Sequence, residues 1–149
     1  MSMREGDRVL SFPAVISETL MEEMERDERI IILGLDVSAR GGLFGLERGL
    51  AERWPERVRD TPISEAGFVG TALGAALGGF HPYVSILYCD FLLVAMDQIC
   101  NQVAKMRFLS GGQVKVPLVI QTSIGRGRSA GAQHSQTIIS PFMHIPGLK

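Results

Sequence analysis

Glu65 is the first residue in this sequence whose type and position together suggest chemistry. It stands in DTPISEAGFVGTALGAALGG, residues 60–79, where it opens a run of small and apolar residues. In a mostly dry pocket, such a carboxylate would hydrogen-bond a basic ring nitrogen. An acid in the first turn of a helix also interacts favourably with exposed amide groups, by about 0.3–1 kcal/mol, without any further function. The residues alone leave both interpretations open.

His134 is the second candidate. It lies in GAQHSQ, a polar loop after a predicted strand, and such loops in doubly wound sheets commonly face a ligand crevice. Histidine is also the side chain most readily poised for proton transfer near neutral pH. A surface histidine without a function fits the same residues. His81 and His144, which lie beside prolines or apolar residues, are interpreted as structural.

The segment IGRGRSA contains a GxGxxA pattern after a predicted strand, which could suggest a dinucleotide site. No helix pattern begins cleanly there, and the ribose-binding acid expected about 20 residues later has no place before Lys149. A flexible or anion-facing loop explains Arg126 and Arg128 better. GxSxG, a lysine-containing phosphate loop and HExxH are all absent from the sequence.

Composition indicates one globular domain. The chain has 149 residues, 46% of them hydrophobic and 21% charged, with a net charge of -1, so bulk charge favours neither nucleic acid nor an anionic membrane. Cys89 and Cys100 lack metal or redox spacing and are expected to be reduced and semi-buried, with no metal bound. The longest uncharged apolar run, residues 66–80, is shorter than the roughly 20 residues that span a bilayer. Since no signal peptide is visible either, a soluble cytoplasmic protein is expected.

Alternating strands and helices must position these residues. Apolar runs predict strands at 30–34, 83–88 and 116–122, and spacing predicts helices near 12–28, 46–54, 63–78 and 90–109, with a short apolar element at 138–143. Thr61 and Pro62 are predicted to start the third helix, and SGG to end the fourth. The strands lack period-two alternation, which predicts an α/β fold: a doubly wound parallel sheet with helices on both faces.

Gly70, Gly74 and Gly78 share one face of the predicted third helix. Each glycine costs up to about 1 kcal/mol relative to alanine in a helix interior, so some other contribution must offset the cost. Close packing against a neighbouring helix or sheet is one explanation, and close approach of another subunit or a ligand is the other.

Several blocks, taken in order, resemble the beta subunit of thiamine diphosphate-dependent 2-oxo acid dehydrogenases, the family of pyruvate, branched-chain 2-oxo acid and acetoin dehydrogenase first components. The blocks are RGL, RVRDTPISEAGFVGTALGAALGG, ILYCDF, DQICNQVAKMRFLSGG, VPLVI, GAQHSQ and HIPGLK, of which DTPISE and QHSQ are the specific ones. The resemblance runs from about residue 30 to residue 149. It implies that residues 1–149 form a single transketolase-like pyrimidine-binding domain, without the family's C-terminal domain.

The resemblance also implies roles for particular residues. Glu65 matches the family glutamate that hydrogen-bonds the pyrimidine ring nitrogen of thiamine diphosphate and favours its imino tautomer. Phe91 matches the aromatic residue on the pyrimidine face, although a core phenylalanine explains it equally from the residues alone. His134 matches a histidine of the active-site channel, with a part in substrate handling or acyl transfer to a lipoyl group.

The partners follow from what the sequence lacks. The family's diphosphate motif, GDG followed by asparagine, is absent, so an alpha-type subunit is expected to hold the diphosphate and magnesium in an alpha2beta2 hetero-oligomer. A lipoyl acyltransferase is a further expected partner. Leu35 stands where family members carry a cofactor-side carboxylate, which makes Asp36 the candidate replacement.

Three functions remain open at this stage. The preferred one is decarboxylation of a 2-oxo acid with transfer of the acyl or aldehyde unit. The first rival is a split transketolase-like carboligase that works without lipoamide. The second is a non-catalytic subunit that only pairs with its partner, which Leu35 and the short chain motivate.

Overall fold

A four-stranded parallel sheet is the frame of the computed structural model, which describes residues 8–149. Its strands are β1 (Ile30–Gly34), β2 (Val58–Asp60), β3 (His81–Tyr88) and β4 (Val119–Ser123), in the order β2-β1-β3-β4. Gly34 pairs with Asp60 on one side and with Ser85 on the other. The carboxyl ends of the strands therefore meet at one edge, and the predicted parallel α/β sheet is confirmed.

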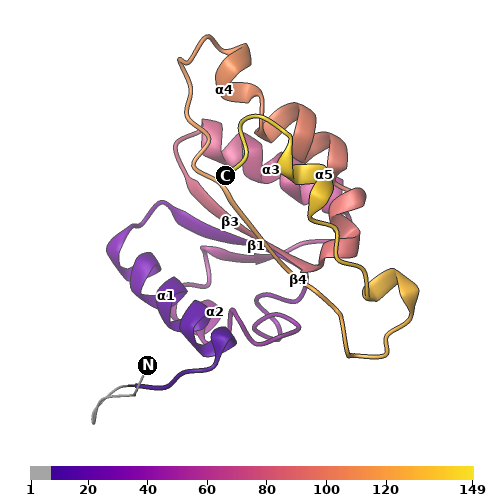
Figure 1. Cartoon of the computed structure of the whole chain (residues 1–149). Helices are drawn as coiled ribbons and strands as arrows, with labels where there is room; N and C mark the ends of the chain where they lie inside the picture. The colour runs from indigo at the N-terminus through magenta and orange to yellow at the C-terminus, as the bar shows by residue number, and fades with distance from the viewer. Residues whose placement is uncertain (1–7) are drawn as a thin grey trace.

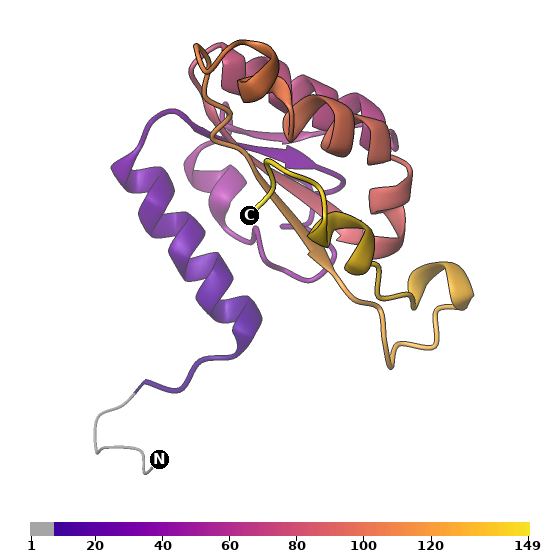
Figure 2. The same cartoon turned by 45° about the horizontal axis from the view of Figure 1, so that its top comes forward.

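Helices cover both faces of this sheet (Figures 1 and 2). On one side lie α1 and α2, and on the other lie α3, the helical segment after β3, and α5. The helices are α1 (Phe12–Arg26), α2 (Leu50–Arg53), α3 (Glu65–Leu77), the 3₁₀ helix η1 (Cys89–Leu93), the π-helix η2 (Gln98–Val103), α4 (Met106–Leu109), the 3₁₀ helix η3 (Ala132–His134) and α5 (Ser140–Met143). Within residues 8–149, no helix combines the length and the apolar character needed to cross a membrane.

Each face of the sheet has its own apolar core. Ile32 and Tyr83 pack with Leu20 and Met24 of α1, whereas the strand residues next to them point the other way. The core on that second face consists of buried residues of the sheet, α3 and the segment after β3: Leu33, Phe68, Val69, Ala72, Val84, Ile86, Cys89, Leu92, Ala95 and Ile99. Because both faces are buried, the strands read as continuous apolar runs.

The start of α3 differs from the prediction. Thr61 and Pro62 do not cap this helix, because the Thr61 amide donates to the Gly34 carbonyl at 3.0 Å and so continues the pairing with β1. Ser64 is the N-cap instead, and its carbonyl accepts from the Phe68 amide at 3.0 Å. Glu65 is therefore the first helical residue.

Other element boundaries also differ from the prediction. The segment predicted as one helix over 90–109 is divided into η1, η2 and α4, and the Ala104 amide donates to the carbonyl of Ile99, five residues back. β4 begins at Val119 because Pro117 lacks an amide hydrogen and Leu118 donates to Val116 in a tight turn. Helix α2 covers only the end of the predicted 46–54, and strand β2, too short for a periodic pattern, was not predicted.

The glycine face of α3 is largely open within this chain. A Cβ on Gly70 would stand 3.6 Å from the Gln98 side chain in η2, whereas a Cβ on Gly74 would meet nothing within 4 Å. Gly74 is exposed. A distance of 3.6 Å is an ordinary van der Waals contact, so packing inside the chain requires glycine at neither Gly70 nor Gly74.

We expect Gly74→Ala to stabilise the isolated chain by about 0.5–1 kcal/mol, because alanine restricts the unfolded chain and strains nothing at this helical position. Gly79→Ala is the matched control. Its Cβ would also meet nothing within 4 Å, but Gly79 has a φ of +96°, so alanine there should destabilise. Urea unfolding of both variants measures the difference, and equal effects would contradict the structure.

Candidate functional site

Glu65 is buried at the end of α3 that faces the carboxyl edge of the sheet. Glu65 is 5% exposed and is the first residue of the helix. Within residues 8–149, no salt bridge includes Glu65. The helix amides favour a negative charge here, but burying a carboxylate without a charged partner is costly. Such a group is suited to receive a hydrogen bond from a ligand.

Phe91 and His134 lie in direct contact, although they are far apart in the sequence. Their ring centroids are 5.3 Å apart in an edge-to-face arrangement. The Tyr88 ring contacts both, at 5.0 Å from His134 and 6.3 Å from Phe91, and Phe44 adds a fourth ring at 5.6 Å from Tyr88. We call these four side chains the aromatic cluster. Tyr88 was not identified from the sequence because an aromatic residue at a strand end resembles ordinary core, and Phe44 was not identified because it lies in a loop without a periodic pattern.

The aromatic cluster is linked to the helix that carries Glu65. Phe91 packs against the apolar core that contains Phe68 and Val69 of α3. Phe91 follows β3, His134 follows β4 and Glu65 follows β2, so all three residues come from segments after strand ends. In parallel sheets, the edge formed by the carboxyl ends of the strands is the usual place for a ligand.

The loop that contains His134 is held in place by hydrogen bonds to Cys89 and Asp90, which directly follow β3. The Cys89 thiol donates to the Gln136 carbonyl at 3.1 Å. The Asp90 carboxylate accepts from the Gln136 amide nitrogen at 3.2 Å and from its Nε2 at 2.9 Å. A Cβ on Gly125 would overlap the His134 carbonyl oxygen, so only glycine allows the two loop segments to approach so closely. Both cysteines are free, as predicted, and Cys89 has this anchoring role.

Asp36 lies at the surface next to this edge. Its side chain is 58% exposed and stands 3.8 Å from Arg40, and its backbone is left-handed, with a φ of 55°. Leu35 is half-buried. Asp36 as a cofactor-binding residue stays a prediction.

A different carboxyl group is buried at the end of β1. Glu47 is 1% exposed and lies near Ser85, the residue paired with Gly34, whose hydroxyl donates to Gln121 at 3.4 Å. Within the described part of the chain, the Oε1 of Glu47 has no partner. Burial raises the pKa of Glu47 above its ordinary value. Burial also raises the pKa of Tyr83, and the negative charge of the nearby Glu47 adds to this second effect. Sequence reasoning missed Glu47 because the glycine-rich loop around it has no periodic pattern.

The raised pKa of Glu47 predicts a definite pH dependence. An acid whose pKa is higher in the folded state stabilises fully below its unfolded pKa of 4.5, and this contribution is lost as the pH rises through the folded pKa. We therefore expect Glu47→Gln to be more stable relative to wild type at pH 7 than at pH 4. Urea unfolding at both pH values measures this, with exposed Glu52→Gln as the control. A constant difference between wild type and Glu47→Gln would contradict a raised pKa for the buried Glu47.

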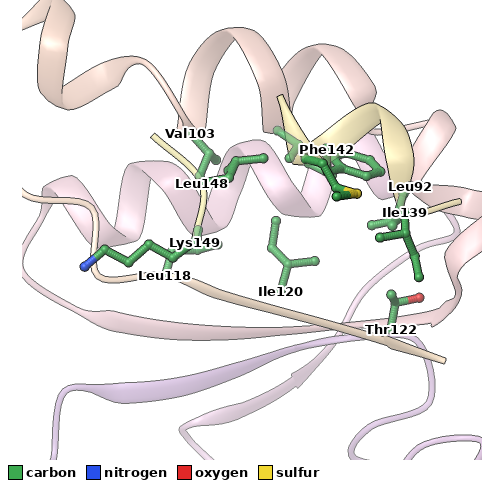
Figure 3. Close-up of a pocket in the computed structure, with 11 residues that line it drawn as sticks. Leu92, Val103, Leu118, Ile120, Thr122, Ile139, Phe142, Leu148 and Lys149 are labelled. Carbon is green, nitrogen blue, oxygen red and sulfur yellow. The ribbon is translucent and has the colours of Figure 1, made fainter. Parts of the chain in front are cut away.

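An apolar cavity of about 470 Å³ lies apart from these residues, between β4, the helices after β3 and the C-terminal segment (Figure 3). Leu118, just before β4, and Ile120 and Thr122 of β4 face Val103 and Phe142 across it. Lys149 is the charged residue that lines it. Since the other lining side chains are almost all apolar, we place the candidate site at the carboxyl edge instead.

Comparisons with known proteins agree with this geometry. A family model described as "Transketolase, pyrimidine binding domain" matches residues 9–149. The beta subunit of acetoin:2,6-dichlorophenolindophenol oxidoreductase from Cupriavidus necator is 42% identical, over 95% of this chain and 45% of that protein. Pyruvate dehydrogenase E1 component subunit beta-4, chloroplastic, from Oryza sativa subsp. japonica is 44% identical, over 99% of this chain and 37% of that protein. The chain thus spans less than half the length of these curated relatives.

A solved structure, described as a split-gene transketolase in an inactive beta4 tetramer, has the same fold. It superposes with a TM-score of 0.61 at 24% identity, over 80% of this chain and 34% of that one. This similarity supports the α/β architecture.

Proposed function

Because the chain belongs to the transketolase pyrimidine-binding domain family, we propose that it is the beta-type part of a thiamine diphosphate-dependent enzyme acting on 2-oxo acids. The reaction is decarboxylation of the 2-oxo acid and transfer of the remaining acyl or aldehyde unit. The observation that carries this proposal is the buried Glu65, without a charged partner in residues 8–149, at the same sheet edge as the Phe91–His134 contact.

The residues present fit an aminopyrimidine ring. Glu65 offers a buried carboxylate, which can accept a hydrogen bond from a protonated ring nitrogen. Phe91 offers an aromatic side chain that is half-buried and in contact with two other rings. When bound, thiamine diphosphate supplies the carbanion chemistry, and the protein supplies orientation and electrostatics. His134, half-buried beside Phe91, is placed to exchange a proton with substrate or acceptor.

The diphosphate and magnesium belong to a partner in this proposal. No group of three or more His, Cys, Asp or Glu residues in positions 8–149 could hold a metal ion. We propose an alpha-type subunit that binds them, in an alpha2beta2 assembly, and a lipoyl acyltransferase as the acceptor. The two dehydrogenase-type relatives described above are named as beta subunits, which supports a partner of this kind.

Co-purification tests the proposal. The chain is co-expressed with a candidate alpha-type subunit, and pyruvate-dependent reduction of 2,6-dichlorophenolindophenol is followed with and without thiamine diphosphate. We expect activity only with both subunits and the cofactor. A stable complex without cofactor-dependent activity on pyruvate, acetoin or a branched-chain 2-oxo acid would favour the non-catalytic role.

A further inference from the structure

The loop that carries His134 is hydrogen-bonded to other segments through one residue, Gln136. We call residues 125–136 the His134 loop. In the part of the chain that the structure describes, three hydrogen bonds join this loop to other segments, and all three involve Gln136. The remaining hydrogen bonds of the loop connect its own residues. Gln136 is therefore the point at which hydrogen bonds attach the loop to the end of β3.

Asp90 provides two of these three hydrogen bonds and is itself buried. Its Oδ1 accepts from the backbone nitrogen of Gln136 at 3.2 Å and from the side-chain Nε2 at 2.9 Å. Asp90 is 6% exposed, and among residues 8–149 its other oxygen, Oδ2, has no partner. If Gln136 moved away, a buried carboxyl group would lose its hydrogen-bond partners, which is costly. The Asp90–Gln136 contact is therefore expected to persist.

His134 follows the position of Gln136 because the loop is compact. The two residues are two positions apart in the sequence. The Gly125 backbone lies against the His134 carbonyl, where a Cβ would overlap. The Ser135 hydroxyl donates to the Gly131 carbonyl at 2.8 Å. Fixing Gln136 thus restrains the loop around His134 as a whole.

The aromatic rings alone leave His134 more freedom. Its ring makes edge-to-face contacts with Tyr88 and Phe91, at centroid distances of 5.0 and 5.3 Å. Such contacts are favourable over centroid distances from about 4.5 to 7 Å. A hydrogen bond from nitrogen to oxygen instead requires about 2.7–3.2 Å and a nearly linear arrangement. The directional restraint on the loop therefore comes from Gln136.

We propose that Asp90 and Gln136 are positioning residues, whose contact fixes the His134 side chain at the carboxyl edge of the sheet. Both act through His134, and neither needs to touch substrate or cofactor. The effect on the reaction rests on the proposed function, in which His134 exchanges a proton with substrate or acceptor. A displaced acid or base loses rate even when its own chemistry is unchanged.

A charge swap at this contact tests the proposal in the 149-residue chain. Gln136→Glu changes an exposed residue and places a second carboxylate beside Asp90, so the contact should open. NMR should then show at least about tenfold faster hydrogen exchange at the amide of residue 136, and weaker contacts between the His134 and Tyr88 rings. The double variant Asp90→Asn/Gln136→Glu should restore both, because the new amide can donate to the new carboxylate. Gln113→Glu, the same change at an exposed position after α4, should alter neither.

Rates of the complex show whether the contact acts through His134. Gln136→Glu should slow transfer to a lipoyl acceptor by about tenfold or more, and the double swap should recover most of the rate. In the His134→Gln background, Gln136→Glu should cause no further loss beyond about twofold, because residues that act as a unit are not additive. General destabilisation by Gln136→Glu would instead reduce the rate in both backgrounds.

Three results would overturn the proposal: unchanged exchange and ring contacts in Gln136→Glu, no recovery in the double swap, or an additive loss in the His134→Gln background. The NMR experiment needs neither the partner nor thiamine diphosphate. Opening by Gln136→Glu and recovery by the swap, in a chain whose complex shows no cofactor-dependent turnover, would support the positioning contact and contradict the proposed function. A functional complex with wild-type transfer in Gln136→Glu would do the reverse.

Discussion

Glu65→Gln should reduce thiamine diphosphate-dependent turnover of the complex by about 100-fold or more while leaving its assembly intact. The amide has nearly the same shape as the carboxylate, so the packing of a residue that is only 5% exposed is kept. It has no negative charge, however, and forms a weaker hydrogen bond with a protonated ring nitrogen. The loss is therefore expected in catalysis and not in folding. Steady-state rates at saturating pyruvate, with size-exclusion chromatography of the complex, measure both.

The control for Glu65→Gln is Glu28→Gln, which changes an exposed acid between α1 and β1. This variant should keep wild-type rates and wild-type assembly. If Glu65→Gln also retains wild-type turnover, Glu65 does not act on the cofactor, and its burial at the start of α3 is explained by the helix amides alone.

His134→Gln should lower transfer of the substrate-derived unit to the acceptor by about 10²–10⁴-fold, the usual range for loss of a positioned acid or base. The side chain is half-buried against Tyr88 and Phe91, and its loop is tied to Asp90 through Gln136. Glutamine can replace part of the packing but cannot exchange a proton near neutral pH. Rapid-mix assays with a lipoyl acceptor measure this step.

The matched variant for His134→Gln is His144→Gln, because His144 is exposed just after α5 and contacts none of the four rings of the aromatic cluster. It should behave as wild type. Cofactor binding should be retained in both histidine variants. Equal losses in the two would show that His134 has no special part in the reaction.

The alternation of strands and helices, and the positions of three of the four strands, followed from the sequence because apolar runs and helical periodicity are local signals. Ile30–Gly34 is a strand with the predicted bounds, and α1 lies within the predicted 12–28. Strand β2, with three residues, exists because Ile32, Leu33 and Gly34 offer a partner edge. Such pairing depends on residues distant in sequence, and no local pattern reports it.

The candidate site also combines residues that could be identified from the sequence with contacts that could not. Glu65, Phe91 and His134 could be identified by resemblance, and the structure places the second and third in contact. The bonds from Cys89 and Asp90 to Gln136 join residues more than 40 positions apart, and so they could not be read from spacing. Glu47 illustrates the limit most clearly, because a charged residue in a glycine-rich loop gives no indication that it is 1% exposed.

The central claim is that this chain forms the pyrimidine side of a thiamine diphosphate site. Isothermal titration of thiamine diphosphate in the presence of magnesium, into the purified complex of this chain with its alpha-type partner, tests that claim most directly. We predict saturable binding by the wild-type complex, binding weakened in Phe91→Ala, and no change in Glu28→Gln. A properly assembled wild-type complex that binds no thiamine diphosphate would contradict the claim.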